Sequence, residues 1–168
     1  LLRSGFTLSQ AFGIAGINMR QAGCQAIIQS EQMAVMGLIE VILHLPKLIY
    51  FFAKIAWAAH QQKPDIAVLI DAPDFNLRLA RILKYMHIPV IYYVSPQVWA
   101  WRTQRVKHIQ RYVDRMLVIL PFEKEFYQQH GIHAQFVGHP LVEQIAQAPS
   151  KTLAQQTLGI PPEASHII

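Results

Sequence analysis

Short apolar runs alternate with longer amphipathic segments along most of this chain. Each run has the length and residue types of a buried strand, and each longer segment has helical spacing of its apolar positions. We therefore predict strands at residues 12–15, 25–28, 66–70, 90–94, 116–119 and 135–137. Helices are predicted at residues 38–61, 75–86, 102–112 and 122–129.

This alternation is typical of an α/β fold. Strands that are apolar along their whole length belong to a parallel sheet with helices on both faces, as in Rossmann-like domains. Such sheets bind their ligands at the carboxyl ends of the strands. The candidate site therefore lies in the segments that follow Ala15, Ile70, Val94 and Val137.

The ends of the chain do not follow this pattern. The opening residues LLRSGF carry neither an initiator methionine nor a signal pattern. Near the other end, Ala148-Pro149-Ser150 interrupts the chain, a short helix is predicted at Lys151–Leu158, and residues 160–163 read as a linker. The last residues read as the start of a strand, so we expect a piece of a longer protein.

The segment from residue 36 to residue 59 is long and apolar enough to suggest a membrane span. Polar and charged residues interrupt it, at Glu40, His44, Lys47 and Lys54. Pro46 lies inside it and is expected to kink or split a helix. We predict an amphipathic helix, which is either a core helix with a wide apolar face or a projecting helix that enters a lipid interface.

The composition limits the class of protein and of partner. Hydrophobic residues make up 52% of the chain and charged residues 15%, as in a folded globular domain. The net charge of +5 favours anionic partners, such as phosphorylated small molecules, an acidic membrane surface or nucleic acid. No nucleic-acid motif accompanies the charge, so we expect no nucleic-acid partner. The single cysteine, Cys24, excludes an internal disulfide.

Two aspartates follow the predicted strand at residues 66–70. Asp71 stands at the carboxyl end of that strand, where a carboxylate can accept a proton from a bound hydroxyl. Asp74 follows Pro73 in the first turn of the next helix, where a carboxylate favours the helix dipole. Asp71 is the candidate general base, although a turn or cap role is an open alternative for both residues.

The next strand is followed by Ser95-Pro96 and by two indoles, Trp99 and Trp101. Flat aromatic faces suit sugars, lipid interfaces or bases, and the alternative is a loop packed on its own tryptophans. The helix that follows is basic, which is typical either of a solvated face or of a phosphate-binding one. Its cations are Arg102, Arg105, Lys107, Arg111 and Arg115, together with His108.

Three histidines, His130, His133 and His139, could suggest a metal site. His130 and His133 flank Gly131, whose presence indicates a turn and not a ligand-bearing helix, and no cysteine joins them. We therefore predict no metal. The Gly13-x-x-Gly16 pattern lacks the other glycines of a phosphate-binding loop, so by itself it does not indicate a phosphate site.

Five strings in this order resemble the lipid-A-disaccharide synthases: AVMGLIEV, KPDIAVLIDAPDFN, YYVSPQVWAWR, LPFEKEFY and FVGHPL. The resemblance extends from about Phe12 to Ile160. It implies half of a GT-B glycosyltransferase, which is built from two Rossmann-like domains facing a cleft. Such a hexosyltransferase joins UDP-2,3-diacylglucosamine to 2,3-diacylglucosamine 1-phosphate with inversion, using no metal or cofactor, to give the lipid A disaccharide.

The resemblance also implies a domain division and a location. Residues 1–148 would form the acceptor-side domain, incomplete at its amino terminus because the family's first strand and glycine-rich loop precede Leu1. Residues 149–168 would be a linker and the start of the nucleotide-sugar-binding domain. Family members act in the cytoplasm on the inner face of the inner membrane of Gram-negative bacteria, as peripheral proteins. The chain departs from the family's common GPRM string, with Gly16-Ile17-Asn18-Met19 at that place.

Residue roles follow from the matching positions. The resemblance makes Asp71 the base that deprotonates the acceptor hydroxyl. Residues implied to bind substrate are Asp74, Asn76, Ser95, Trp99, Trp101, Arg102 and His139. Residues implied to dock on the membrane or to hold acyl chains are Ile39, Val41, Ile42, Leu45, Leu48, Ile49 and Phe52.

Two other functions stay open at this point. One is a membrane- or lipid-binding module without catalysis, because the chain contains no complete donor site. The other is a different GT-B nucleotide-sugar transferase of the same architecture. Self-association into a homo-oligomer is also left open.

Overall fold

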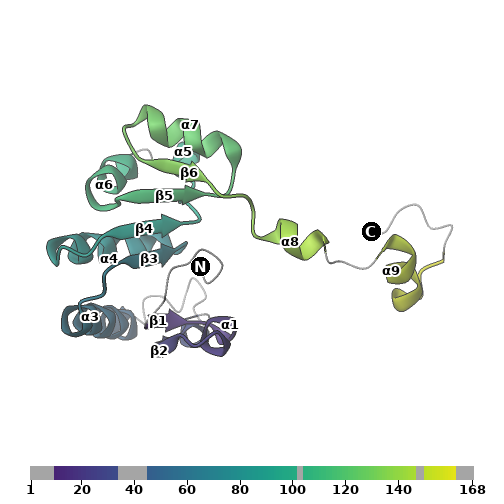
Figure 1. Ribbon diagram of the computed structural model, residues 1–168, viewed down its shortest axis with the longest axis horizontal. Coiled ribbons are helices and arrows are strands. Elements are labelled where there is room, and N and C mark those ends of the chain that lie inside the picture. Colours follow the sequence, from purple (N-terminus) through teal and green to yellow (C-terminus); the bar gives the residue numbers. More distant parts are fainter. Residues whose placement is uncertain (1–9, 34–44, 102–103, 147–149, 162–168) are drawn as a thin grey trace.

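The structure, a computed structural model, describes residues 10–33, 45–101, 104–146 and 150–161. A four-stranded parallel sheet has the order β3-β4-β5-β6. Its strands are Ala67–Ile70, Val90–Tyr93, Arg115–Val118 and Ala134–Phe136. A second parallel pair, β1 (Phe12–Ala15) and β2 (Gln25–Gln29), lies below β3 in Figure 1. Parallel strands flanked by helices confirm the predicted Rossmann-like α/β class.

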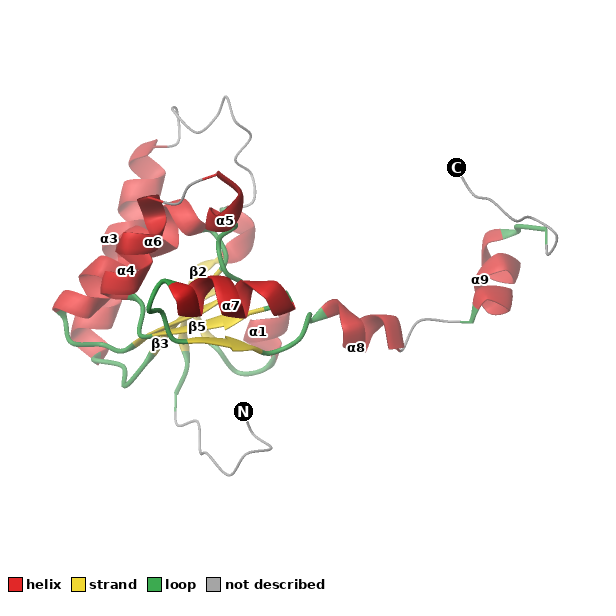
Figure 2. Ribbon diagram, turned by 90° about the horizontal axis from the view of Figure 1, so that it is seen from above, coloured by secondary structure: helices red, strands yellow, loops and turns green. Residues whose placement is uncertain are grey.

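Helices connect and flank the strands. They are α1 (Ile17–Gln21), α3 (Leu45–Gln62), α4 (Pro73–Tyr85), α5 (Val98–Trp101), α6 (Gln104–Tyr112), α7 (Pro121–Gln129), α8 (Leu141–Ala146) and α9 (Lys151–Leu158), with a 3-10 turn, η2, at Ser30–Gln32. Three of them, α3, α4 and α6, pack next to one another on one side of the strands (Figure 2), whereas α7 packs against β5 and β6.

The predicted strands agree with the observed ones to within one residue at each end. Of the helices, the pattern missed α1, α5 and α8, which have only five, four and six residues. Apolar periodicity needs more than one helical turn to show itself, so helices of this length leave no clear signal.

The core lies between the four-stranded sheet and its helices. Val90 and Tyr92 of β4 and Met116 and Val118 of β5 are all 0% exposed. Burial of such a side chain stabilises the fold by roughly 1.5–3 kcal/mol. The central strands are therefore the most firmly held, and they carry the site described below at their carboxyl ends.

The strand β3 is buried on one face only. Leu69 is 6% exposed, whereas its neighbours Val68 and Ile70, which point to the opposite face, are 51% and 46% exposed. Since β3 stands at the end of its sheet, these two side chains form an apolar strip at that edge.

The helix α3 has a buried face and an exposed apolar face. Phe51, Ile55 and Ala59 belong to the core, while Tyr50 and Trp57 are 58% and 64% exposed. The core interpretation is therefore right for one face, but it leaves the exposed aromatic residues unexplained. No helix in the described ranges has the length and apolar character needed to cross a bilayer.

The predicted kink or split at Pro46 falls at the limit of the described residues and stays a prediction. Pro46 is the second residue of α3 as the structure describes it, and residues 34–44 lie outside the described ranges. Three residues assigned to membrane contact, Ile39, Val41 and Ile42, lie outside the described residues, as does the side chain of Leu45.

The carboxyl-terminal helices α8 and α9 extend away from the sheet (Figure 1). The boundaries predicted for α9 are confirmed. Ser150 Oγ accepts a hydrogen bond from the Leu153 N–H at 3.3 Å, and Gly159 ends the helix in the left-handed conformation with φ of 65°. The structure thus gives residues 150–159 a defined helix with a cap at both ends.

Candidate active site

A pocket of about 350 Å³ lies at the carboxyl ends of β3 and β4. Asp71 and Pro73 line it from the turn after β3, residues 94–98 from the turn after β4, and Arg105 from α6. Two of the segments predicted to form a site therefore come together, as expected for neighbouring parallel strands.

The two turns share an uncommon backbone conformation. Asp71 and Ala72 have φ of 49° and 44°, and Val94, at the end of β4, has φ of 61°. For residues other than glycine such angles cost about 1–3 kcal/mol each, most of all for a β-branched residue, and they concentrate at functional sites. Both strands thus leave the sheet abruptly at the pocket.

A clamp holds the backbone of Asp71. Its carbonyl oxygen accepts hydrogen bonds from Asn76 Nδ2 at 2.8 Å and from the Tyr92 hydroxyl at 2.6 Å. Asn76 Nδ2 also donates to the Ile70 carbonyl at 3.0 Å, and the Asp71 N–H continues the strand ladder to Tyr93 O at 3.0 Å. The clamp leaves the Asp71 side chain exposed at the pocket.

The two clamping side chains are both buried. Asn76 is 9% exposed and Tyr92 is 0% exposed. Burial, with a further contribution from the charge of Asp71, raises the pKa of Tyr92 far above its usual value. The phenol therefore stays protonated and keeps donating to Asp71. The Asn76 amide nitrogen thus binds the turn, and the predicted contact of Asn76 with substrate stays a prediction.

Asp74 lies in the first turn of α4 and forms an ion pair with Arg105 of α6. A carboxylate at this position also favours the helix dipole. The pair links two helices at the rim of the pocket, and it places a guanidinium group among the pocket-lining residues. The sequence signal for Arg105 was only the basic face of its helix.

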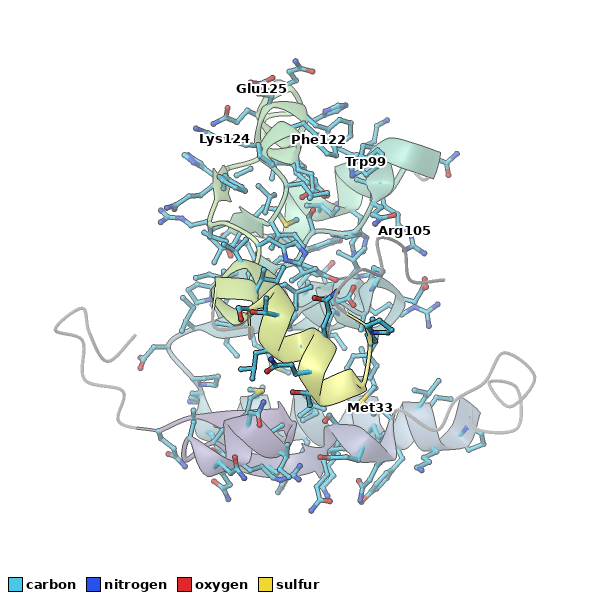
Figure 3. The ribbon with its side chains drawn as sticks, turned by 90° about the vertical axis from the view of Figure 1, so that its right-hand side faces the viewer. Met33, Trp99, Arg105, Phe122, Lys124 and Glu125 are labelled. Carbon is cyan, nitrogen blue, oxygen red and sulfur yellow. The ribbon has the colours of Figure 1, made fainter. Side chains whose placement is uncertain are left out.

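Ser95 and Trp99 both bind the buried carboxylate of Glu123 on α7. Ser95 Oγ donates to Glu123 Oε1 at 2.6 Å, and Trp99 Nε1 donates to the same oxygen at 3.3 Å. The Trp99 ring stands edge-on to Phe122, with ring centroids 5.0 Å apart, and remains 38% exposed. Figure 3 shows these two rings side by side, with Arg105 on the same side of the molecule. Trp99 therefore packs on α7 and still presents part of its ring to solvent.

Another predicted residue, His139, does not line this pocket. His139 follows β6, and its Nδ1 accepts a hydrogen bond from the Leu141 N–H at 3.2 Å at the start of α8. Two strands separate β6 from β3, so the two strands that precede His139 and Asp71 lie about 14 Å apart across the sheet. Arg102 and the side chain of Trp101 lie outside the described residues.

Sequence reasoning missed Tyr92 and Glu123 as site residues. Tyr92 was hidden inside an apolar strand, and Glu123 inside an amphipathic helix. Within the described ranges, no group of three or more His, Cys, Asp or Glu side chains is arranged to hold a metal ion. The polar side chains that line the pocket are a carboxylate, a hydroxyl, an amide and a guanidinium, from Asp71, Ser95, Gln97 and Arg105.

Comparison with known proteins places the chain in a family. Residues 2–168 match the family model described as lipid-A-disaccharide synthetase. The chain belongs to this family. It is 54% identical over 134 residues to the lipid-A-disaccharide synthase of Koribacter versatilis, a stretch that covers 80% of this chain and 35% of that protein.

Two further lipid-A-disaccharide synthases give the same result. The chain is 44% identical to that of Myxococcus xanthus over 91% of its own length and 40% of the relative. It is 45% identical to that of Geobacter metallireducens over 96% of its length and 42% of the relative. The chain thus spans well under half the length of these relatives.

Proposed function

We propose that the full-length protein containing this chain is a lipid-A-disaccharide synthase, and that this chain supplies the acceptor side of its active site. The observation that carries the proposal is Asp71, exposed at a pocket on a turn that Asn76 and Tyr92 clamp through its backbone. Family membership supports the reaction class. The acceptor would be 2,3-diacylglucosamine 1-phosphate and the donor UDP-2,3-diacylglucosamine.

Asp71 is the general base in this proposal. Its carboxylate removes the proton from the acceptor 6-hydroxyl as that oxygen attacks the anomeric carbon of the donor. The bond from this carbon to the UDP oxygen breaks, and UDP leaves with the bonding electrons, so the anomeric configuration inverts. The groups that stabilise the UDP leaving group would belong to the nucleotide-sugar-binding domain, for which residues 149–168 are proposed as the linker and the start.

Arg105 is the pocket residue best suited to a phosphate. A guanidinium carries five N–H donors in a planar array that matches phosphate oxygens, and Arg105 presents this group at the pocket while its Nη2 pairs with Asp74. We place the acceptor 1-phosphate beside Arg105, in the pocket that Ser95 lines from the turn after β4.

A strand preceding β1 would complete the sheet in this proposal. In a doubly wound sheet of order 3-2-1-4-5-6, the strand before β1 lies between β1 and β3. That position is next to the apolar strip formed by Val68 and Ile70, and it would join the two sheets into one. The division into an acceptor-side domain and a following domain remains part of the proposal.

Membrane docking is assigned to the exposed face of α3. Ile49 and Tyr50 are 61% and 58% exposed, and Lys54 Nζ lies 5.8 Å from the Tyr50 ring centroid. Apolar and aromatic side chains accompanied by lysine suit the boundary between lipid headgroups and acyl chains.

Phe52 of α3 packs edge-on against Phe75 of α4, with ring centroids 5.5 Å apart. The helix α3 therefore connects its exposed face to α4, the helix that begins beside Asp71. Leu48, another residue assigned to membrane contact, is half-buried.

Replacing Ile49 and Tyr50 together by serine should weaken binding to phospholipid vesicles about tenfold, because apolar area that would enter the bilayer is lost. The measurement is co-sedimentation of the full-length protein with vesicles of mixed zwitterionic and anionic phospholipid. The matched control replaces Val142 and Leu153, which are 62% and 53% exposed on α8 and α9. Equal binding of both double variants to the vesicles would show that the exposed face of α3 is not the docking surface.

The proposed function is tested with purified full-length protein and the two proposed substrates. Formation of a diacylglucosamine disaccharide 1-phosphate with release of UDP supports it. Turnover only with other acceptors or donors would favour another nucleotide-sugar transferase. Vesicle binding without any glycosyl transfer would favour a lipid-binding module.

A further inference from the structure

Glu123 is a buried carboxylate that connects α7 to the pocket of Asp71. It is 1% exposed. Its Oε1 accepts hydrogen bonds from Ser95 Oγ and Trp99 Nε1, and its Oε2 accepts one from the Leu120 N–H at 3.2 Å. Burial of a carboxylate is costly unless such donors compensate its charge. Two of these three donors belong to the segment after β4 that forms the pocket side.

These contacts determine the direction of the hydrogen bond at Ser95. The indole N–H of Trp99 and the Leu120 N–H can only donate, so both oxygens of Glu123 act as acceptors. A serine hydroxyl has one proton and two lone pairs. Because that proton points at Glu123 over 2.6 Å, the hydroxyl of Ser95, a residue that lines the pocket, has only lone pairs left for a ligand.

We propose that Glu123 is a positioning residue that sets the polarity of Ser95, so that the pocket accepts a hydrogen-bond donor from its ligand at this point. The chemical groups that fit are a sugar hydroxyl and the N–H of an N-acylated amino sugar. The inference rests on the proposed function, in which the pocket holds an acylated glucosamine. A bare oxyanion placed at the same point would meet the lone pairs of Ser95 and be repelled.

A second contact from α7 holds the same segment. Tyr127 lies four residues after Glu123, is 0% exposed, and donates from its hydroxyl to the Pro96 carbonyl at 3.0 Å. Burial raises the pKa of Tyr127, which keeps this donor protonated. The backbone of Val94 in its left-handed conformation begins the segment, and such a conformation persists only where surrounding contacts hold it. Glu123 and Tyr127 supply those contacts from one face of α7.

The test uses full-length Glu123→Gln and measures the dissociation constant of 2,3-diacylglucosamine 1-phosphate without donor. A glutamine amide has an acceptor side and a donor side, so it cannot accept from both Ser95 and Leu120. We expect binding of the acceptor to weaken about tenfold, the size of one hydrogen bond. Ser95→Ala should weaken it to the same extent, and the double variant should be no worse than Glu123→Gln, because one residue acts through the other.

The control is Glu125→Gln on the exposed side of α7, which should bind as the unaltered protein does (Figure 3). An NMR spectrum of the tryptophan indole N–H groups gives a second readout, in which Glu123→Gln should move the Trp99 resonance and leave that of Trp57 in place. Unchanged acceptor binding in Ser95→Ala, additive losses in the double variant, or an unmoved Trp99 resonance would each overturn the inference. Absence of glycosyl transfer by the unaltered protein would instead refute the proposed function, since neither readout depends on turnover.

Discussion

Asp71→Asn in the full-length protein should lower kcat/KM by about two to four orders of magnitude, the usual contribution of a general base. Asparagine has nearly the same shape but cannot take the proton of the acceptor hydroxyl. The fold should be retained, because the contacts that hold this residue use its backbone carbonyl and N–H and not its carboxylate. The measurement is disaccharide formation at saturating donor, together with thermal unfolding.

The matched control is Asp65→Asn. Asp65 is an exposed aspartate at the opposite, amino-terminal end of β3, so the same loss of charge there should leave turnover within about twofold. Near-normal turnover of Asp71→Asn would remove Asp71 from the role of base. A large loss in both variants would indicate a general effect of charge and not a catalytic group.

Asn76→Asp should destabilise the protein by roughly 3 kcal/mol, because it replaces a hydrogen-bond donor by a carboxylate oxygen facing two carbonyl oxygens. Asn76 is buried, so water cannot relieve this repulsion. The turn that carries Asp71 would then shift, and turnover should fall together with stability. Urea unfolding of the variant and its activity measured well below the unfolding transition provide the test.

A comparable substitution at an exposed amide serves as the control. Asn18→Asp in the first turn of α1 should change the free energy of unfolding by no more than about 0.5 kcal/mol. Unaltered stability in Asn76→Asp would contradict the clamp. If turnover fell while stability stayed the same, Asn76 would be a substrate-contacting residue, as the family resemblance implies.

Much of the fold could be predicted because its signals are local. An apolar run followed by an aspartate and a proline, as at residues 66–73, specifies a strand, a turn and a helix start from neighbouring residues alone. The same local pattern placed Asp71 at the carboxyl end of a strand, where the structure has it. For α3 the pattern gave an apolar helix but could not say which apolar residues are buried, since that depends on packing against α4 and β2.

The contacts that support the site could not be predicted from the sequence, because they join residues that are far apart along the chain. Tyr92 donates to Asp71 across 21 positions, Ser95 to Glu123 across 28, and Arg105 to Asp74 across 31. None of these pairs has a periodic signal, since each forms only when neighbouring parallel strands and their helices are brought together. The sequence by itself thus determined the strands, the principal helices and the position of Asp71. Only the tertiary structure decided what clamps Asp71 and what orients Ser95, because hydrogen bonds between separate elements depend on packing and not on spacing along the chain.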